Sequence, residues 1–225
     1  MAINIAIDGP SGAGKSTMAR AAAKALGYVY VDTGALYRSV GVHVLRQGLD
    51  TANAADVVRA LATAQVSLRY AGGEQKVFLG SEDVSEAIRR PEASMAASNV
   101  SAVPEVRAFL FDLQKDLARE NDCVMDGRDI GTVVLPEADV KIFLTASAEE
   151  RARRRFEELT EKGNEVDYET ILAEIRQRDY NDSNRAIAPL KPAEDSVRVD
   201  TTGLSLEEAT GLILDVILSK LTNGE

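Results

Sequence analysis

Gly9-Pro-Ser-Gly-Ala-Gly-Lys-Ser16 is the stretch that decides the fold of this chain. It matches the pattern G-x-x-x-x-G-K-[ST], in which glycines let the backbone wrap around an anion and successive N–H groups point at phosphates. In this pattern Lys15 reaches the β- and γ-phosphates and the Ser16 hydroxyl binds Mg²⁺. Residues 3–7 read as a buried strand before the loop, and residues 18–26 read as a helix after it. Because strand, loop and helix are the context that the motif requires, we expect a nucleoside triphosphate site rather than a turn that binds nothing.

Composition limits the possible classes of protein. The chain has 225 residues, enough for one substantial core with a small attached lobe. Its net charge of −10 argues against nucleic acid or a membrane surface as a partner. The single cysteine, Cys123, excludes an internal disulfide framework, and the single histidine, His43, lies inside a helical pattern between Val42 and Val44, which argues against a catalytic role. With no apolar stretch long enough for a bilayer and no secretory signal, we expect a cytoplasmic protein.

Short apolar strands alternate with helices along most of the chain. This order predicts an α/β fold, with a parallel sheet flanked by helices on both faces. One interruption stands out, because residues 66–70 and 76–79 alternate around a turn at 71–74 and so predict a β-hairpin. We interpret it as part of a small insert closed by residues 82–88. Further strands are expected at 28–31, 123–125, 140–144 and 197–199, and helices at 35–47, 56–64, 91–99, 104–119, from 148, 167–181 and from 205.

Phosphoryl transfer needs an acceptor site as well as a triphosphate site, and polar residues at strand ends are candidates for it. Tyr37 and Arg38 follow one predicted strand, although Arg38 would also suit a solvated surface. Arg128 and Asp129 follow another strand, at the carboxyl edge where open α/β sheets bind ligands. The segment 126–129 would otherwise be a simple polar turn.

Two groups of arginines have both a functional and a structural interpretation. Arg178, Asp182 and Arg185 share one side if their segment is helical, where they would bind an anion or form an exposed ion-pair ladder. The arginines at 151, 153, 154 and 155 would either form an exposed helix face or, at 151, 154 and 155, reach the donor phosphates. Other nucleotide-binding classes fit less well. The chain has no Asn/Thr-Lys-x-Asp element, and Thr17 stands where G-x-G-x-x-G would need glycine.

Four segments together resemble the bacterial cytidylate kinase family, within the nucleoside monophosphate kinases. They are residues 7–17, Asp32-Thr-Gly-Ala-Leu-Tyr-Arg38, Asp126-Gly-Arg-Asp-Ile-Gly-Thr132 and Asn184-Arg-Ala-Ile-Ala-Pro189. The resemblance covers essentially the whole chain, including the insert near residues 66–86. It implies one P-loop kinase domain over residues 1–225, with a five-stranded parallel sheet in the order 2-3-1-4-5. It also implies a monophosphate-binding region at 33–105 and a lid-like region at 148–185.

The resemblance further implies transfer of the ATP γ-phosphoryl group to CMP or dCMP, with Mg²⁺. We also expect a monomer that, given its net charge, binds neither nucleic acid nor membrane. Lys15, Arg38, Arg128 and Arg185 would be catalytic, and Ser16 would bind the metal. ATP would contact Gly9, Pro10, Ser11, Gly12, Ala13, Gly14, Lys15, Ser16 and Thr17. The acceptor would contact Thr33, Tyr37, Arg38, Ser98, Arg107, Arg128, Asp129, Arg178, Asp182 and Arg185.

The implied base contacts suit cytosine. Its N4 amino group donates hydrogen bonds, which Asp129 or Ser98 would accept, and its N3 and O2 accept them, which suits Arg107. Uracil reverses the polarity at position 4 and N3 and would leave buried groups badly paired. The alternatives are a P-loop kinase with another acceptor and an ATP-binding regulatory switch. A switch would consume ATP without CMP, whereas a kinase requires the acceptor.

Overall fold

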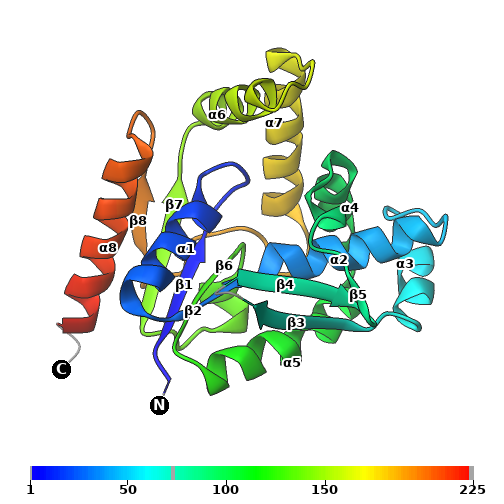
Figure 1. The fold of residues 1–225 in the computed structure, drawn as a ribbon, viewed down its shortest axis with the longest axis horizontal. Coiled ribbons are helices and arrows are strands. Elements are labelled where there is room, and N and C mark those ends of the chain that lie inside the picture. The colour runs from blue at the N-terminus through cyan, green and yellow to red at the C-terminus, as the bar shows by residue number, and fades with distance from the viewer. Residues whose placement is uncertain (1, 72–73, 223–225) are drawn as a thin grey trace. The chain divides into compact units, whose positions relative to one another are not determined.

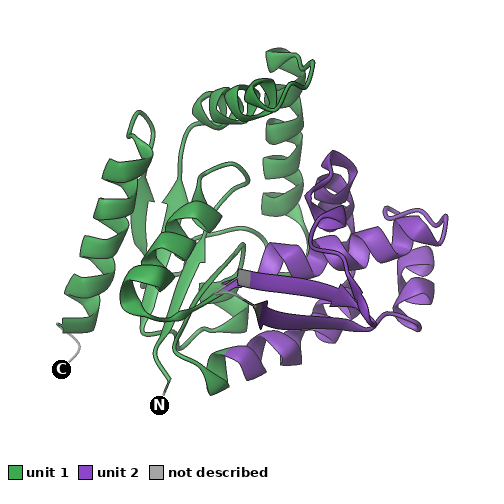
Figure 2. Cartoon of the chain, in the orientation of Figure 1, with its two compact units in different colours: residues 1–30, 118–225 green, residues 31–117 purple. Residues whose placement is uncertain are grey.

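The computed structural model describes residues 2–71 and 74–222, which form two compact units (Figure 2). Unit 1 comprises Met1–Tyr30 and Ala118–Glu225, and unit 2 comprises Val31–Leu117. β2 (Val29–Asp32) carries the chain out of unit 1, and α5 (Pro104–Glu120) carries it back. Unit 2 is therefore a single continuous insertion into unit 1.

A five-stranded sheet has the order β2-β6-β1-β7-β8 (Figure 1). β1 (Asn4–Asp8) pairs in parallel with β6 (Cys123–Gly127) and β7 (Val140–Thr145), and β7 pairs in parallel with β8 (Val197–Asp200). Counted along the chain, these five strands have the order 2-3-1-4-5. The predicted α/β fold and its strand order are confirmed.

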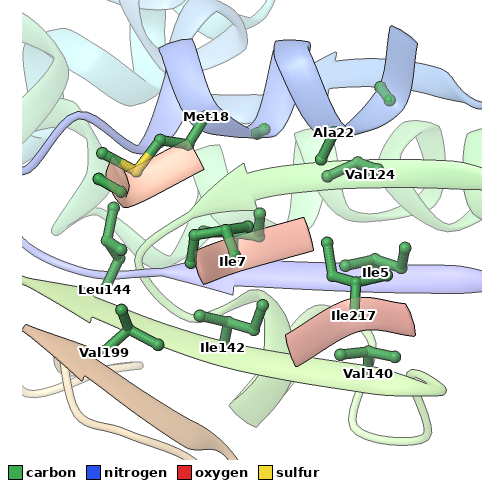
Figure 3. Close-up of a cluster of buried hydrophobic side chains, with 14 of the residues drawn as sticks. Ile5, Ile7, Met18, Ala22, Val124, Val140, Ile142, Leu144, Val199 and Ile217 are labelled. Carbon is green, nitrogen blue, oxygen red and sulfur yellow. The ribbon is translucent and has the colours of Figure 1, made fainter. Parts of the chain in front are cut away.

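The core of unit 1 lies on one face of this sheet (Figure 3). Ile5 and Ile7 are fully buried, and the register places Ile142 of β7 beside Ile7 on the same face. Side chains of a strand alternate between faces, so the odd-numbered residues of β1 form one apolar row. Met18 of α1 (Lys15–Leu26) and Ile217 of α8 (Leu206–Thr222) pack onto that row.

Two further helices of unit 1, α6 (Ala148–Glu161) and α7 (Tyr168–Asn184), pack on each other through a small apolar cluster. Ser147 caps α6 by accepting a hydrogen bond from the Glu150 amide, and Asp167 caps α7 by accepting one from the Thr170 amide. These caps satisfy N–H groups that lack partners within the helix. Residues 162–167 connect the two helices and are mostly polar.

Unit 2 contains four helices and a three-stranded antiparallel sheet among its described residues. β3 (Val66–Ala71) pairs with β4 (Glu74–Leu79), and β4 pairs with the short β5 (Glu82–Asp83). The predicted hairpin and insert are confirmed, while the turn at residues 72–73 lies outside the described residues. The helices are α2 (Thr33–Arg46), α3 (Ala54–Leu61), α4 (Pro91–Ser101) and α5, with a 3₁₀ turn at Ala87–Arg89.

Several element boundaries differ from the prediction for local reasons. α1 begins at Lys15 rather than at 18, because the Gly14 carbonyl already accepts the amides of Thr17 and Met18. α2 begins at Thr33 rather than at 35. The side chain of Asp32 caps the helix by accepting the Ala35 amide.

Segment 126–132 also differs from a plain loop. Its first two residues belong to β6, and Ile130–Val134 form a single π-helical turn, here named the π turn. The Leu135 amide donates to the Ile130 carbonyl at 2.7 Å, and the Val134 amide donates to the Asp129 carbonyl at 3.3 Å. Such turns often occur at functional sites.

Cys123 opens β6 and is fully buried. Its thiol donates to the Asn4 amide oxygen at 3.1 Å, and burial raises its pKa to about 12. The thiol is therefore protonated and unreactive in the folded protein, as expected for a buried structural cysteine. Among the described residues, no helix is long and apolar enough to cross a membrane.

Candidate active site

The phosphate-binding loop follows β1 directly and has the backbone that its sequence predicts. Gly9 has a φ of 151°, and a Cβ atom there would lie 1.9 Å from the Leu144 carbonyl oxygen on β7. Only glycine fits so close to a neighbouring strand. Gly12 and Gly14 have φ of 76° and 87°, the left-handed region that glycine adopts at no steric cost. The loop then enters α1, whose first N–H groups are available to an anion.

Lys15 is buried at the start of α1, and its ammonium group donates to the Pro10 carbonyl at 2.7 Å. Burial holds its pKa well below the usual value, and Arg128 and Arg178 lower it further. Asp126 and Asp8 act in the opposite direction. A polyphosphate bound beside Lys15 would favour the charged amine, since an opposite charge within a few ångströms stabilises the ionised form.

Ser16 contacts a carboxylate that the sequence did not single out as a site residue. Its hydroxyl donates to Asp126 Oδ2 at 2.9 Å, and the Tyr30 hydroxyl donates to Asp126 Oδ1 at 2.9 Å. Asp126 lies on β6, level with Ile7 of β1, and is almost completely buried. One carboxylate and one hydroxyl at the phosphate loop fit Mg²⁺, which keeps waters and phosphate oxygens as its other ligands. No group of three or more potential ligand side chains occurs within 2–71 and 74–222.

Four predicted acceptor residues form two ion pairs within unit 1. Arg128 Nε donates to Asp182 Oδ2 at 2.9 Å, and Arg185 Nη2 lies 3.3 Å from Asp129 Oδ1. Burial raises the pKa of Asp182, but the positive charges of Arg128 and its neighbours outweigh this, so its pKa is lowered. These residues pair across elements and are largely buried, so an exposed ladder along α7 is not what the structure shows.

Arg185 has a second contact, and Arg178 contacts the phosphate loop. Arg185 Nε donates to the Ala188 carbonyl at 2.6 Å, and Ala188 adopts a φ of 48°, which is rare for a residue other than glycine. Arg178 Nη1 donates to the hydroxyl of Ser11 in the phosphate loop at 3.0 Å. The phosphate loop and the acceptor residues of α7 are therefore joined directly within unit 1.

A buried carboxylate at the end of β1, Asp8, connects the same region to the π turn. Asp8 Oδ1 accepts the Ile130 amide at 2.8 Å, and Oδ2 accepts the Gly131 amide at 2.7 Å. The residue is 5% exposed, and burial raises its pKa to about 6. No local sequence pattern indicates these contacts, because both partners are more than 120 residues away in the chain.

The predicted residues of unit 2 lie on α2, α4 and α5. The guanidinium carbon of Arg107 lies 5.7 Å from the centre of the Tyr37 ring, a cation–π contact, and Arg107 is largely buried. Arg38 forms an ion pair with Asp32 at 2.8 Å and remains partly exposed. Thr33 and Ser98 are also buried, in the first turn of α2 and within α4 respectively.

The arginines of α6 divide into buried and exposed members. Arg151 is 4% exposed and forms a two-pronged ion pair with Asp179 at 3.0 and 2.6 Å. It also donates to the carbonyls of Ala146 at 2.9 Å and Ser11 at 3.0 Å. Its guanidinium group thus ties α6 and α7 to the phosphate loop.

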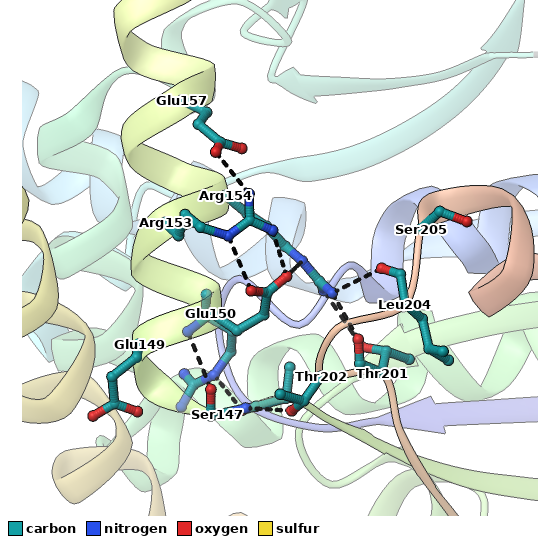
Figure 4. Close-up of polar contacts among 12 residues, drawn as sticks. Ser147, Glu149, Glu150, Arg153, Arg154, Glu157, Thr201, Thr202, Leu204 and Ser205 are labelled. Carbon is teal, nitrogen blue, oxygen red and sulfur yellow. Dashed lines mark hydrogen bonds and ion pairs between the residues drawn. The ribbon is translucent and has the colours of Figure 1, made fainter.

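The other arginines of α6 bind protein partners (Figure 4). Arg154 pairs with Glu150 and donates to the Thr201 carbonyl at 2.7 Å, whereas Arg153 pairs with Glu150 and Glu157 on the helix surface. The Glu150 carboxylate is thereby engaged, so Ser147 and Glu150 form only half of a capping box. The amide of Ser147 instead donates to Thr202. The box at Ser205 and Glu208 is complete.

Comparison with known proteins gives one consistent result. A family model described as Cytidylate kinase matches residues 5–219. The chain is 50% identical over 221 residues to a cytidylate kinase of Caldicellulosiruptor saccharolyticus, covering 98% of each chain. It is 50% identical over 206 residues to a cytidylate kinase of Streptococcus agalactiae serotype V, covering 91% of each. A solved structure of an uncharacterized protein from Eubacterium ventriosum matches with a TM-score of 0.54 at 14% identity, covering 97% of this chain and 99% of that one, which concerns the fold alone.

Proposed function

This chain belongs to the cytidylate kinase family. We propose which of its residues bind ATP and which bind the acceptor when the ATP γ-phosphoryl group is transferred to CMP or dCMP. The enzyme is a phosphotransferase that makes CDP or dCDP and ADP. One observation carries the residue assignment. Within unit 1, two acceptor arginines, Arg128 and Arg178, lie close enough to Lys15 to lower its pKa.

On the donor side, the backbone N–H groups of residues 9–17 bind the ATP phosphates and Lys15 neutralises the charge that develops on the transferred group. Phosphoryl transfer requires mainly positioning and charge neutralisation from the protein. Ser16 and Asp126 would hold Mg²⁺, which would supply positive charge that offsets the negative charge of the phosphates. Arg151 is committed to protein partners, so it orients the loop rather than binding phosphate.

On the acceptor side, Arg128 and Arg185 bind the monophosphate from unit 1, with Arg178 and Asp182 holding the ribose. From unit 2, we assign phosphate binding to Arg38 with Tyr37 and Thr33 nearby, and cytosine recognition to Ser98 and Arg107 with Asp129. Residues 33–105 would serve as the monophosphate-binding region, and residues 148–185 as a lid. We also propose a cytoplasmic monomer that binds neither nucleic acid nor membrane, with sedimentation velocity as the check on its mass.

The reaction is tested by ADP release with CMP, dCMP, UMP and AMP as acceptors. We expect rapid ATP consumption with CMP and little without an acceptor. A kcat/KM for UMP comparable to that for CMP would contradict the assigned base contacts. Substantial ATP hydrolysis that is independent of CMP would instead favour a switch.

The acceptor role of Arg128 has its own test. We expect Arg128→Ala to impair turnover with CMP while leaving ATP affinity nearly unchanged, because Arg128 pairs with Asp182 rather than with the phosphate loop. Titration of each nucleotide separately distinguishes the two sites. Unchanged CMP kinetics would remove Arg128 from the acceptor site.

A further inference from the structure

Asp8 is a buried carboxylate with no assigned part in phosphoryl transfer, and its two hydrogen bonds reach the segment that bears Arg128 and Asp129. Both carboxylate oxygens are used, at 2.8 Å to the Ile130 amide and 2.7 Å to the Gly131 amide. Consecutive amides held by one carboxylate fix the position and the orientation of the backbone. A single bond would constrain the orientation of the segment less.

The π turn explains why an outside acceptor is required. The first N–H groups of any helical turn have no acceptor within the turn itself. Ile130 and Gly131 are the first two residues of the π turn and are both buried, so unpaired amides there would be costly. Asp8 caps the turn from a neighbouring strand and not from the preceding residue, because the Asp129 side chain makes no capping bond.

Gly131 packs closely against the Lys141 side chain. A Cβ atom at residue 131 would lie 3.2 Å from Lys141 Cδ and 3.4 Å from Asp8 Oδ2. The first distance is tight and the second is an ordinary van der Waals contact, so a side chain at residue 131 would press on Lys141.

The residues held by this turn bear the charges of the acceptor side. Arg128 and Asp129 immediately precede the turn, and they pair with Asp182 and Arg185 respectively. The Asp129 carbonyl also accepts the Val133 amide at 2.9 Å, which continues the turn. A displacement of the turn would therefore move both ion pairs together.

We propose that Asp8 is a positioning residue for the acceptor side, which acts by holding the Ile130 and Gly131 amides so that Arg128 and Asp129 keep the orientation that binds the nucleoside monophosphate. This inference rests on the proposed acceptor role of those two residues. The carboxyl end of β1 would then support both nucleotide sites, because Asp8 holds the acceptor side and Gly9 begins the phosphate loop immediately after it.

Asp8→Asn is the primary test, because it keeps the shape of the side chain but replaces one acceptor oxygen with an N–H donor. We expect the KM for CMP, and the Kd for CMP measured without ATP, to rise about tenfold, the effect of one lost buried hydrogen bond. The KM for ATP should change by less than about twofold, and the melting temperature should not fall below that of the wild type.

Asp139→Asn is the matched control. Asp139 Oδ2 accepts the Asn4 amide at 2.7 Å, so it makes the same kind of bond to the opposite end of the same strand, far along β1 from the phosphate loop. Its CMP and ATP constants should equal those of the wild type. If Asp8→Asn does not fold, Asp8→Ala is the second variant. It removes both acceptor oxygens without placing a side-chain N–H against a backbone N–H, and it should weaken CMP binding further.

The outcomes are distinct. Equal changes in the CMP and ATP constants, or a change for ATP alone, would overturn the proposal by assigning Asp8 to the phosphate loop. Unchanged CMP binding in both variants would also overturn it. A wild-type enzyme that fails to phosphorylate CMP would refute the proposed function instead, and that result is obtained before any variant is compared.

Discussion

Replacing Asp8 with asparagine also predicts an effect on stability that depends on pH. Asp8 is 5% exposed, and burial raises the pKa of its carboxyl group from 3.8 to about 6. The nearby charge of Asp129 also raises it, while the two amide hydrogen bonds and Lys15 lower it. The two amide hydrogen bonds thus stabilise the ionised carboxylate, whereas burial and the charge of Asp129 destabilise it.

The magnitude follows from the difference between the two pKa values. From 3.8 to about 6, it corresponds to about 3 kcal/mol, at about 1.36 kcal/mol for each pH unit. The folded protein holds the proton more tightly than the unfolded chain, so the contribution of Asp8 to the free energy of unfolding falls as the pH rises. The fall begins near pH 3.8 and is complete above about pH 6. Roughly half of it, about 1.4 kcal/mol, occurs between pH 5 and 7.5.

Asparagine does not titrate and removes this cost. Its amide nitrogen, however, faces one backbone N–H group, and an unsatisfied buried donor costs about 1–3 kcal/mol. The two effects oppose each other at pH 7.5, where we expect Asp8→Asn to be between equal in stability to the wild type and about 2 kcal/mol more stable. At pH 5 this difference should shift by about 1.4 kcal/mol in favour of the wild type.

Urea unfolding followed by circular dichroism at pH 5, 6 and 7.5 measures the difference directly. The comparison with the wild type cancels the contributions of all other carboxylates. A difference between Asp8→Asn and the wild type that stays constant from pH 5 to 7.5, or moves in the other direction, would refute the reasoning. The carboxyl group of Asp8 would then not be buried in the way described.

Three other substitutions test separate parts of the site. Lys15→Ala should lower kcat by about a hundredfold or more in the ADP-release assay, because it removes a charge that stabilises the transferred group; a loss below tenfold would contradict that role. Arg151→Lys should lower the free energy of unfolding by about 2–3 kcal/mol, since lysine cannot replace the two-pronged pair, whereas the exposed Arg153→Lys should change it by less than about 0.5 kcal/mol; equal effects would show that burial does not matter there. Gly9→Ala should abolish ATP binding or prevent folding, because the added methyl group meets the Leu144 carbonyl at 1.9 Å; near-normal ATP affinity would show that the strands can separate there.

The order of the elements was predictable from the sequence because each depends on local patterns. The phosphate loop has a fixed spacing of glycines and lysine, and apolar residues recur at strand and helix periods around it. The cap at Asp167 and the box at Ser205 and Glu208 are likewise formed by residues three apart. These features need no knowledge of the tertiary fold.

The contacts of Asp8 and Asp126 were not predictable in the same way. Asp126 meets Ser16 across 110 positions, and Asp8 meets the π turn across 122, so both contacts depend on the parallel register of β1 and β6. A side chain on the opposite face of either strand would miss its partner. The π turn itself has no sequence pattern that separates it from a loop.

The arginines of α6 show the same limit. Arg151 and Arg153 occupy one short run of arginines, and the sequence left open which of them would face solvent. The difference arises from Asp179, 28 residues further along, which the packing of α7 brings to Arg151. Glutamates on α6 itself bind Arg153.

Cys123 has a practical consequence, since it is the only thiol in the chain. With its side chain fully buried and its pKa raised to about 12, it can react with a thiol-specific dye only while the β1–β6 pair is transiently open. The labelling half-life of the unmodified protein therefore measures how often the central sheet separates. Because Asn4 and Cys123 lie at the end of β1 opposite to the phosphate loop, slower labelling with ATP present would show that nucleotide binding stiffens the whole strand.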